Sequence, residues 1–323
     1  MNARSILIVA HAYRDDTVEA AARIVAIIRE QGATPVFAPD DRAGLAAVIP
    51  DLAGVAALDE DIPLDDIEIA IVLGGDGTIL RAAELVRGGS APILGINMGH
   101  VGFLAESERD DMDDAVQRIL AGEYRVEERL ALAVKVRDAS GDVIFESWAL
   151  NEVSIEKASR QRMIELIVEI DRRPLSAYGA DGIVIATPTG STAYGFSAGG
   201  PVIWPTVQAI AVVPISAHAL FARPLVVGPE HAVAIEVQGG IDGSTGVMWC
   251  DGRRSHEIPV GARVSVRRSD APVRLARLHP AQFTDRLVRK FQLPVHGWRG
   301  PTGTLMTETL PVVPHAEKGG SAQ

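Results

Sequence analysis

Five consecutive residues combine a carboxylate with a backbone that can approach a phosphate closely. They are Gly74, Gly75, Asp76, Gly77 and Thr78. The apolar run 69–73 before them suits a buried strand, and apolar residues recur at helical spacing after them. Backbone N–H groups and the helix dipole favour negative charge at such a turn, which predicts a phosphate site. Asp76 would repel phosphates there, unless a divalent cation bridges them or the carboxylate takes a proton from an attacking hydroxyl.

This turn differs from the two common phosphate-binding loops. A P-loop has a lysine after its last glycine, where this chain has Thr78. The dinucleotide-binding fingerprint has a third glycine, where this chain has Leu80. The structural alternative is a tight turn, because Asp-Gly is a favoured turn pair. A hairpin turn should lead into another strand, however, and the following residues have a helical pattern.

A second glycine-containing loop follows the next predicted strand, 92–96. It runs from Asn97 to Glu106 and contains Gly99 and Gly102. In a parallel sheet the two loops would lie side by side if their strands are neighbours. Taken alone, the second loop is better interpreted as a structural turn before an acidic helix.

Composition excludes several classes of partner. Among 323 residues, 31 Lys and Arg against 42 Asp and Glu give a net charge of −11. This balance argues against binding nucleic acid or an anionic membrane surface, and no apolar stretch approaches the roughly 20 residues of a membrane span. The 8 histidines show no zinc spacing, so no fixed metal ligands are expected. A single cysteine, Cys250, allows no intrachain disulfide, and we expect a cytoplasmic location.

Periodicity predicts two domains. Strand and helix patterns alternate over 1–125, which predicts an α/β domain with a Rossmann-like parallel sheet that contains the phosphate site. Two-residue alternation over 126–280 predicts a mostly antiparallel, all-β domain. Residues 281–299 include a helical pattern, and we expect them to pack back on the first domain. The tail 300–323 is rich in Pro, Gly, Ser and Thr, and we expect it to be mobile.

Two places in the β-rich region contain polar groups suited to a ligand. Asn151-Glu152 lies among apolar residues and could offer an amide and a carboxylate to sugar hydroxyls, although a strand-end turn is the structural alternative. Between Asp181 and Tyr194 an apolar strand runs into a loop with four hydroxyl side chains. Such a loop could donate hydrogen bonds to phosphate or ribose without adding charge, which favours a site over a merely solvated loop.

One hydrolase-like pattern lacks its structural context. Gly195 to Gly199 fits the G-x-S-x-G nucleophile elbow, which needs a strand directly before it and a helix directly after it. Here the hydroxyl-rich loop precedes the pattern and Gly200-Pro201 follows it, so a serine hydrolase is not predicted.

Taken together, the motifs resemble those of the NAD kinase family. The resemblance extends in order from about residue 69 to residue 252. Its motifs are Gly74 to Thr78, Asn97-x-Gly99 with Gly102-Phe-Leu104, Asn151-Glu152, Asp181-Gly182, Thr187 to Tyr194, and Asp251-Gly252. The glycine–aspartate motif also occurs in lipid kinases and phosphofructokinases. The Asn-Glu pair and the Thr187 to Tyr194 loop are the motifs that favour the NAD kinase family among these kinases. Arg253 departs from the pattern, where Gln is frequent.

The resemblance implies a reaction and a set of site residues. It implies phosphoryl transfer from ATP or polyphosphate, with Mg²⁺ or Mn²⁺, to the 2′-hydroxyl of the adenosine ribose of NAD, giving NADP. Asp76 is implied as the proton acceptor, at a site between the two domains, with the phosphate donor on 1–125 and NAD on 126–280. The residues implied to bind nucleotide or NAD are Asp76, Gly77, Arg81, Asn151, Glu152, Asp181, Thr192, Ala193, Tyr194, Gly195, Phe196 and Ser197. A homo-oligomer, as a dimer or tetramer, is also implied.

Two other functions remain open from the sequence. A lipid kinase of the diacylglycerol or sphingosine type would use the same glycine–aspartate loop, although the acidic charge balance disfavours a membrane surface. A non-catalytic, dinucleotide-binding regulator would keep the loop without turnover, although a pure phosphate binder gains nothing from Asp76.

Overall fold

The computed structural model describes residues 4–11, 14–46, 54–99, 102–159, 162–238, 245–279 and 283–295. Its first half is built around an eight-stranded sheet in which the first strands in the chain pair in parallel. The strands of this sheet are β1 Ser5–Ala10, β2 Thr34–Phe37, β3 Ala56–Ala57, β4 Ile67–Leu73, β5 Ile93–Asn97, β6 Ser107–Glu108, β7 Arg125–Arg129 and β20 Val273–Arg277.

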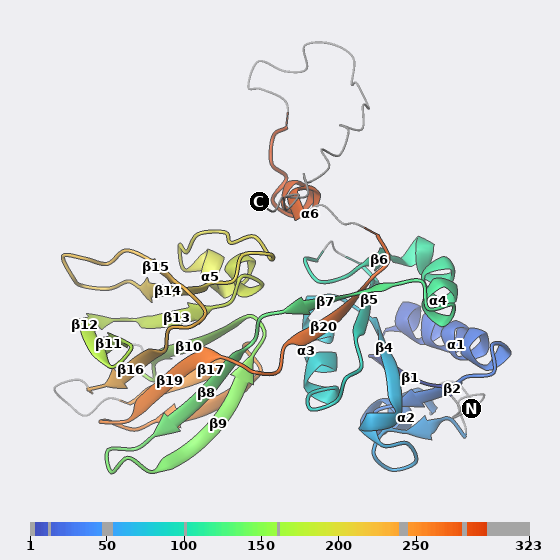
Figure 1. The fold of residues 1–323 in the computed structure, drawn as a ribbon, viewed down its shortest axis with the longest axis horizontal. Coiled ribbons are helices and arrows are strands. Elements are labelled where there is room, and N and C mark those ends of the chain that lie inside the picture. The colour runs from blue at the N-terminus through green and yellow to red at the C-terminus, as the bar shows by residue number, and fades with distance from the viewer. Residues whose placement is uncertain are drawn as a thin grey trace, which may run out of the picture.

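Helices cover both faces of this sheet, as the alternating pattern predicts. They are α1 Asp15–Glu30, α2 Pro39–Ala46, α3 Asp76–Leu85 and α4 Met112–Leu120, with short 3-10 turns η2 Leu64–Asp66 and η3 Arg109–Asp111. Apolar residues of α1 and α4 share one core with the sheet, and those of α3 share another on the opposite face (Figure 1). Strand β4 is buried over nearly its whole length, because both of its faces are covered.

The second half is a sandwich of two six-stranded antiparallel sheets. One sheet contains β10 Glu152–Lys157, β13 Gly182–Ala186, β14 Ile210–Ile215, β15 Leu225–Val227, β17 Gly246–Cys250 and β18 Arg254–Ile258. The other contains β8 Leu132–Arg137, β9 Val143–Ala149, β11 Ile164–Ile170, β12 Arg173–Ala180, β16 Val233–Val237 and β19 Arg263–Arg268. Inward-facing residues of both sheets form one apolar core. The predicted fold class, α/β followed by antiparallel β, is therefore confirmed.

The sheets divide the chain differently from the expected boundary at residues 125 and 126. Strand β7 spans that boundary and pairs antiparallel with β20, which also lies in the first sheet although 126–280 was expected to be the β domain. Alternation marks a strand, but it does not say which sheet the strand joins. The chain thus crosses from the first half to the sandwich after β7 and returns through β20.

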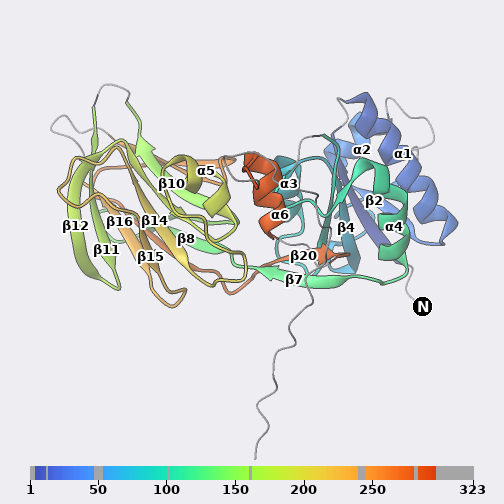
Figure 2. The same cartoon turned by 90° about the horizontal axis from the view of Figure 1, so that it is seen from above.

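Two short helices lie near the junction of the halves. They are α5 Tyr194–Ser197, which follows the 3-10 turn η4 Gly190–Thr192, and α6 Phe283–Phe291. Figure 2 shows α6 between α5 and α3. Its Phe283 and Phe291 contact Phe103 of the first half at ring distances of 6.0 and 5.8 Å. Residues 300–323, expected to be mobile, lie outside the described residues. In the described part of the chain, no helix is both long and apolar enough to cross a membrane.

Candidate active site

Asp76 lies at the first position of α3, directly after the glycine turn that ends β4. The helix begins two residues before the expected Thr78, with Gly75 as its N-cap. A Cβ on Gly74 would overlap the Thr78 side chain, so this close turn requires glycine. Gly77 is exposed, whereas Thr78 is buried, and the turn thus presents glycine backbone to solvent beside the carboxylate.

The second glycine loop binds the carboxylate of Asp76. The backbone N–H groups of Phe103 and Leu104 each donate to one of its oxygens, both at 3.0 Å. Strands β4 and β5 are parallel neighbours, which brings the loops after them together as expected. A Cβ on Gly102 would overlap the carboxylate, so only glycine allows this approach. Each oxygen keeps lone pairs for a further hydrogen bond, and Asp76 is only partly buried.

Asp251 fixes the backbone around Asn151 and Glu152. Its carboxylate accepts hydrogen bonds from the N–H groups of Leu150 and Asn151 at 3.0 and 2.7 Å, and Arg254 donates to it at 2.9 Å. Asp251 adopts a left-handed conformation with φ of 56°, which is unusual for a residue with a Cβ. The buried carboxylate of Asp251 therefore takes the place of the backbone carbonyls with which the N–H groups of Leu150 and Asn151 would otherwise have to pair.

Glu152 is buried and faces the start of α5. The N–H of Tyr194 donates to its carboxylate at 3.2 Å. Burial, together with the neighbouring Asp251 carboxylate, raises the pKa of Glu152 to about 8. A carboxyl with such a pKa can be present in either protonation state near neutral pH, which makes it a candidate functional group.

The hydroxyl-rich loop uses its hydroxyls differently from the expectation. Thr187 donates to the carbonyl of Leu150 at 2.6 Å, and Ser191 donates to that of Pro188 at 2.7 Å. Thr192 donates to the carbonyl of Thr189 at 3.1 Å. These three hydroxyls thus stabilise the loop itself. The sequence could not show this, because a hydroxyl binds ligand and backbone equally well.

Gly190 lets this loop pack directly on the Asn151 turn. A Cβ at Gly190 would overlap the backbone carbonyl of Asn151. The N–H of Thr187 also donates to that carbonyl at 2.9 Å. The loop therefore places η4, with Thr192, and α5, with Gly195, Phe196 and Ser197, next to Asn151 and Glu152, and Ala193 lies between these two elements.

Asp181 and Arg81 lie in ion pairs. Asp181, between β12 and β13, is 2.5 Å from Lys157, and this hydrogen bond lowers its pKa. Burial raises the pKa of Tyr194, and the carboxylates of Glu156, Glu152 and Asp181 add to this shift. Arg81 makes a bidentate pair with the buried Asp41 at 2.7 and 2.9 Å. In this structure Arg81 is therefore directed to Asp41, and its expected contact with nucleotide phosphates stays a prediction.

The expected site residues thus form two groups, one around Asp76 and one around Asn151 and Glu152. Among the residues described, no hydrogen bond or ion pair runs directly from an expected site residue of one group to one of the other. A row of aromatic rings lies between the groups: Phe291 of α6 is 5.8 Å from Phe103 and 4.5 Å from Phe196. The sequence analysis missed this contribution of α6, although its two terminal phenylalanines could have indicated it.

Other features that sequence reasoning missed lie in the turns. Asp251 and Gly102 belong to the motifs that carry the resemblance, but nothing in their spacing showed which atoms they contact. Ser197 lies in the four-residue α5 and follows η4, so the hydrolase pattern lacks its strand here as well. Within the described ranges, no cluster of three or more His, Cys, Asp or Glu side chains could bind a metal.

A glycine turn with a carboxylate, beside a β-sandwich with a buried Asn-Glu turn, is suited to a phosphotransferase that acts on a nucleotide. Family models agree with this class: the ATP-NAD kinase N-terminal domain matches residues 6–124, and the ATP-NAD kinase C-terminal domain matches residues 150–278. The chain therefore belongs to the ATP-NAD kinase family.

Relatives in sequence extend over nearly the whole chain. An NAD kinase of Leifsonia xyli subsp. xyli is 58% identical over 300 residues, covering 93% of this chain and 98% of the relative. NAD kinase 2 of Streptomyces avermitilis is 52% identical, with 92% and 97% covered. An NAD kinase of Mycobacterium tuberculosis is 48% identical over 305 residues, with 92% and 98% covered.

Solved structures share the fold. Yeast NADH kinase complexed with NADH aligns with a TM-score of 0.81 at 21% identity, covering 91% of this chain and 89% of that chain. An NAD kinase from Archaeoglobus fulgidus in complex with ATP aligns with a TM-score of 0.66 at 22% identity, covering 90% and 98%. Together with the sequence relatives, the family match makes the chain an NAD kinase, and neither a lipid kinase nor a non-catalytic regulator is supported.

Proposed function

We propose that this NAD kinase transfers a phosphoryl group from ATP to the 2′-hydroxyl of the adenosine ribose of NAD, with Asp76 as the proton acceptor. The observation that carries the proposal is the position of Asp76, at an exposed glycine turn and oriented by two backbone N–H groups. A ribose hydroxyl is a weak nucleophile near neutral pH, so a positioned carboxylate within about 3 Å assists its attack. Phosphoryl transfer otherwise depends on alignment and on neutralising charge.

NAD would bind on the sandwich side of the site. Asp251 fixes the backbone of Asn151 and Glu152, and the segment from Thr192 to Ser197 lies beside them. We propose that these residues, with Asp181 and Tyr194, bind the dinucleotide and bring its adenosine ribose to Asp76. The aromatic contacts of α6 with Phe103 and Phe196 support this arrangement, because they connect the loop that binds Asp76 with the α5 helix that would bind NAD.

The donor would bind at the glycine turn. Gly75 and Gly77 offer backbone N–H groups at the start of α3, where the helix dipole favours phosphate, whereas the N–H groups of Gly74 and Thr78 donate to the carbonyls of Ile96 and Gly75. Mg²⁺ or Mn²⁺ would arrive with the phosphates as part of the substrate, because phosphate oxygens and water are the ligands that such a cation prefers. Polyphosphate would present the same oxygens, and Arg81 would reach either donor only after leaving Asp41.

We further propose a cytoplasmic homo-oligomer, a dimer or tetramer. Leu220, Phe221 and Val226 are exposed near the edge strand β15, and an apolar surface at a sheet edge suits a second copy of the chain. Light scattering coupled to size exclusion would give the mass in solution, and a monomer at micromolar concentration would contradict this part.

Product analysis tests the proposed reaction. The full chain is incubated with MgATP and NAD, then with MgATP and vesicles that contain diacylglycerol, and then with polyphosphate and NAD. We expect NADP, detected by an NADP-specific dehydrogenase, from the first mixture and no phosphorylated lipid from the second. Binding of NAD without any NADP, from either donor, would contradict the proposal.

A further inference from the structure

A cavity of about 560 Å³ lies where β7, β20 and α6 meet the segment 204–206. Its volume is in the range of nucleotide-sized ligands. None of the residues expected to bind NAD or to act in catalysis lines it. Four arginines do so, Arg125, Arg129, Arg277 and Arg286, and Trp204 and Phe283 are among the aromatic side chains beside them.

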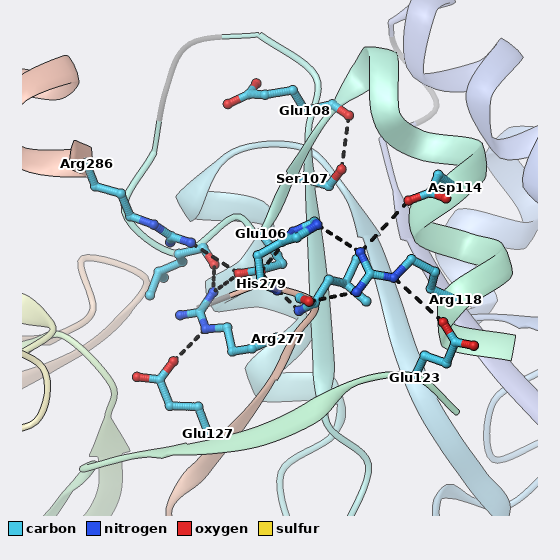
Figure 3. A network of polar contacts seen from close by, with 12 residues as sticks. Glu106, Ser107, Glu108, Asp114, Arg118, Glu123, Glu127, Arg277, His279 and Arg286 are labelled. Carbon is cyan, nitrogen blue, oxygen red and sulfur yellow. Dashed lines mark hydrogen bonds and ion pairs between the residues drawn. The ribbon is translucent and has the colours of Figure 1, made fainter. Parts of the chain in front are cut away.

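Positive charge is in excess around this cavity. Glu127 is the carboxylate in its lining, and it is shared by Arg277 at 2.5 Å and Arg129 at 2.9 Å. Behind the lining, Glu106 is shared by Arg277 at 3.0 Å and Arg286 at 3.2 Å (Figure 3). Arg125 makes no ion pair within the described part of the chain. Four guanidinium groups therefore face two carboxylates.

Arg129 is the group that most needs a further partner. Its side chain is only 8% exposed, and its Nε lies close to Glu127 but makes no hydrogen bond with proper geometry. Its Nη1 reaches Thr189 at 3.5 Å, which is a weak bond. Burial and the nearby Arg277 lower the pKa of Arg129 to about 10. A guanidinium has five N–H donors, and in the described part of the chain those of Arg129 meet only Glu127 and Thr189, which leaves donors for a further anion.

We propose that this cavity binds a phosphate-bearing anion, with its phosphate on Arg125, Arg129 and Arg277. Guanidinium forks match the geometry of phosphate oxygens, and several forks around one cavity suit a group with more than one negative charge. Trp204 is 45% exposed and lies edge-on to Phe283 at 4.9 Å, so its ring can stack on a base when the phosphate belongs to a nucleotide.

The cavity is connected to Asp76 through one residue. The carbonyl of Phe103 accepts a hydrogen bond from Arg286 at 2.6 Å, and the N–H of the same residue donates to Asp76 at 3.0 Å. An anion that attracts Arg286 would therefore change the loop that orients the catalytic carboxylate. A bound anion in this cavity should therefore change the rate of NAD phosphorylation.

Calorimetry on the full chain tests this site. NAD and a non-hydrolysable ATP analogue are kept in excess so that the substrate sites are filled, and inorganic phosphate, tripolyphosphate or AMP is titrated in turn. We expect a further binding event, weakened at least about tenfold in Arg125→Ala, because a hydrogen bond to a charged group contributes that much. Trp204→Ala should weaken AMP alone, which distinguishes a nucleotide from a free phosphate chain.

The control is Arg274→Ala on β20, the strand that pairs with the β7 strand of Arg125. Arg274 pairs with Glu128 at 3.3 Å and does not line the cavity, so this variant should bind the anions like the wild type. The proposal is overturned if none of the three anions binds beyond the substrate sites. It is equally overturned if Arg125→Ala matches the wild type, or if Arg274→Ala loses as much affinity as Arg125→Ala. Because the titration records binding and not turnover, its outcome does not depend on the reaction proposed above.

Discussion

At the scale of single residues, the orientation of Asp76 depends on the absence of a side chain at Gly102. A Cβ there would overlap the carboxylate, so Gly102→Ala must displace Asp76 or the loop that binds it. A displacement of about 1 Å can reduce catalysis on the order of a hundredfold. We expect kcat in Gly102→Ala to fall at least about tenfold, measured by NADP formation.

Gly99→Ala is the matched control for this substitution. Gly99 lies in the same loop, and the nearest atom to a Cβ there is 4.0 Å away on Arg14. Its kcat should stay close to the wild-type value. Equal losses in both variants would mean that the loop as a whole, and not its contact with Asp76, limits turnover.

Glu152 should make stability depend on pH in a specific direction. Its pKa is raised to about 8, so the folded chain keeps this proton at pH values where the unfolded chain has lost it. Wild-type stability therefore decreases as pH rises from about 4.5 toward 8. Glu152→Gln removes this dependence. The difference in free energy of unfolding, variant minus wild type, should therefore increase by more than about 1 kcal/mol as the pH rises from about 4.5 to 8.

Urea unfolding of both chains at pH 5, 7 and 8.5 provides the measurement. A constant difference between the two free energies of unfolding across these pH values would show that Glu152 is ionised in the folded chain throughout. The pKa of Asp251 is also raised by burial, but Asp251 is present in both chains and its effect is shared to a first approximation.

The sequence predicted the glycine–aspartate turn but not the groups that orient the site. Gly74 to Thr78 are adjacent in the chain, so their chemistry follows from local pattern. Asp251 is 100 residues from Asn151, the residue whose N–H it binds, and its role depends on the packing of β10 against β17. The hydroxyls of Thr187 and Ser191 likewise found backbone partners that no spacing rule specifies.

At the scale of elements, α6 connects the two groups of site residues. Phe291 contacts Phe103, which binds Asp76, and Phe196, which is expected near NAD. Aromatic pairs contribute about 0.5–1.5 kcal/mol each beyond their buried area. Without the Phe291 ring, the distance between the site residues around Asp76 and those around Glu152 is no longer fixed by α6. Phe291→Ala should therefore lower kcat/KM for NAD about fivefold.

Leu293→Ala provides the comparison for this prediction. Leu293 lies two residues after the end of α6 and is 46% exposed, so its loss should leave kcat/KM unchanged. If Phe291→Ala also kept wild-type kinetics for NAD, α6 would be a structural cover without influence on the site.

Element patterns predicted strands and helices better than sheet membership. Strand β4 and helix α3 were expected because a buried apolar run and helical spacing are local properties. Strand β20 and all but the first residue of β7 lie in the range expected to form the β domain, yet these strands pair with each other and extend the first sheet. This pairing joins residues about 150 positions apart, and two-residue alternation is the same in either sheet.

At the scale of the whole molecule, helix α3 also contacts the sandwich at its far end. Glu84 of α3 pairs with Arg253 at 3.1 Å and Arg254 at 3.0 Å, and Arg254 also binds Asp251. The helix that begins with Asp76 is therefore connected to the turn that holds Asn151. Arg253, which departs from the family pattern, belongs to this contact.

Removing this connection should weaken catalysis without unfolding either half. Glu84→Ala is expected to lower kcat/KM for NAD about fivefold, since a partly exposed ion pair contributes up to about 1 kcal/mol. Glu68→Ala is the control, because Glu68 pairs with Arg4 inside the first half. The account of the junction fails if Glu68→Ala reduces kcat/KM as much as Glu84→Ala does.

The most direct test of the mechanism is the turnover of Asp76→Asn. The substitution keeps the size of the side chain and one of the two oxygens that accept the N–H groups of Phe103 and Leu104, but it removes the base. We predict that the melting temperature and the affinity for NAD stay near wild type while kcat falls at least about a hundredfold. A kcat within about twofold of the wild-type value would contradict proton transfer to Asp76.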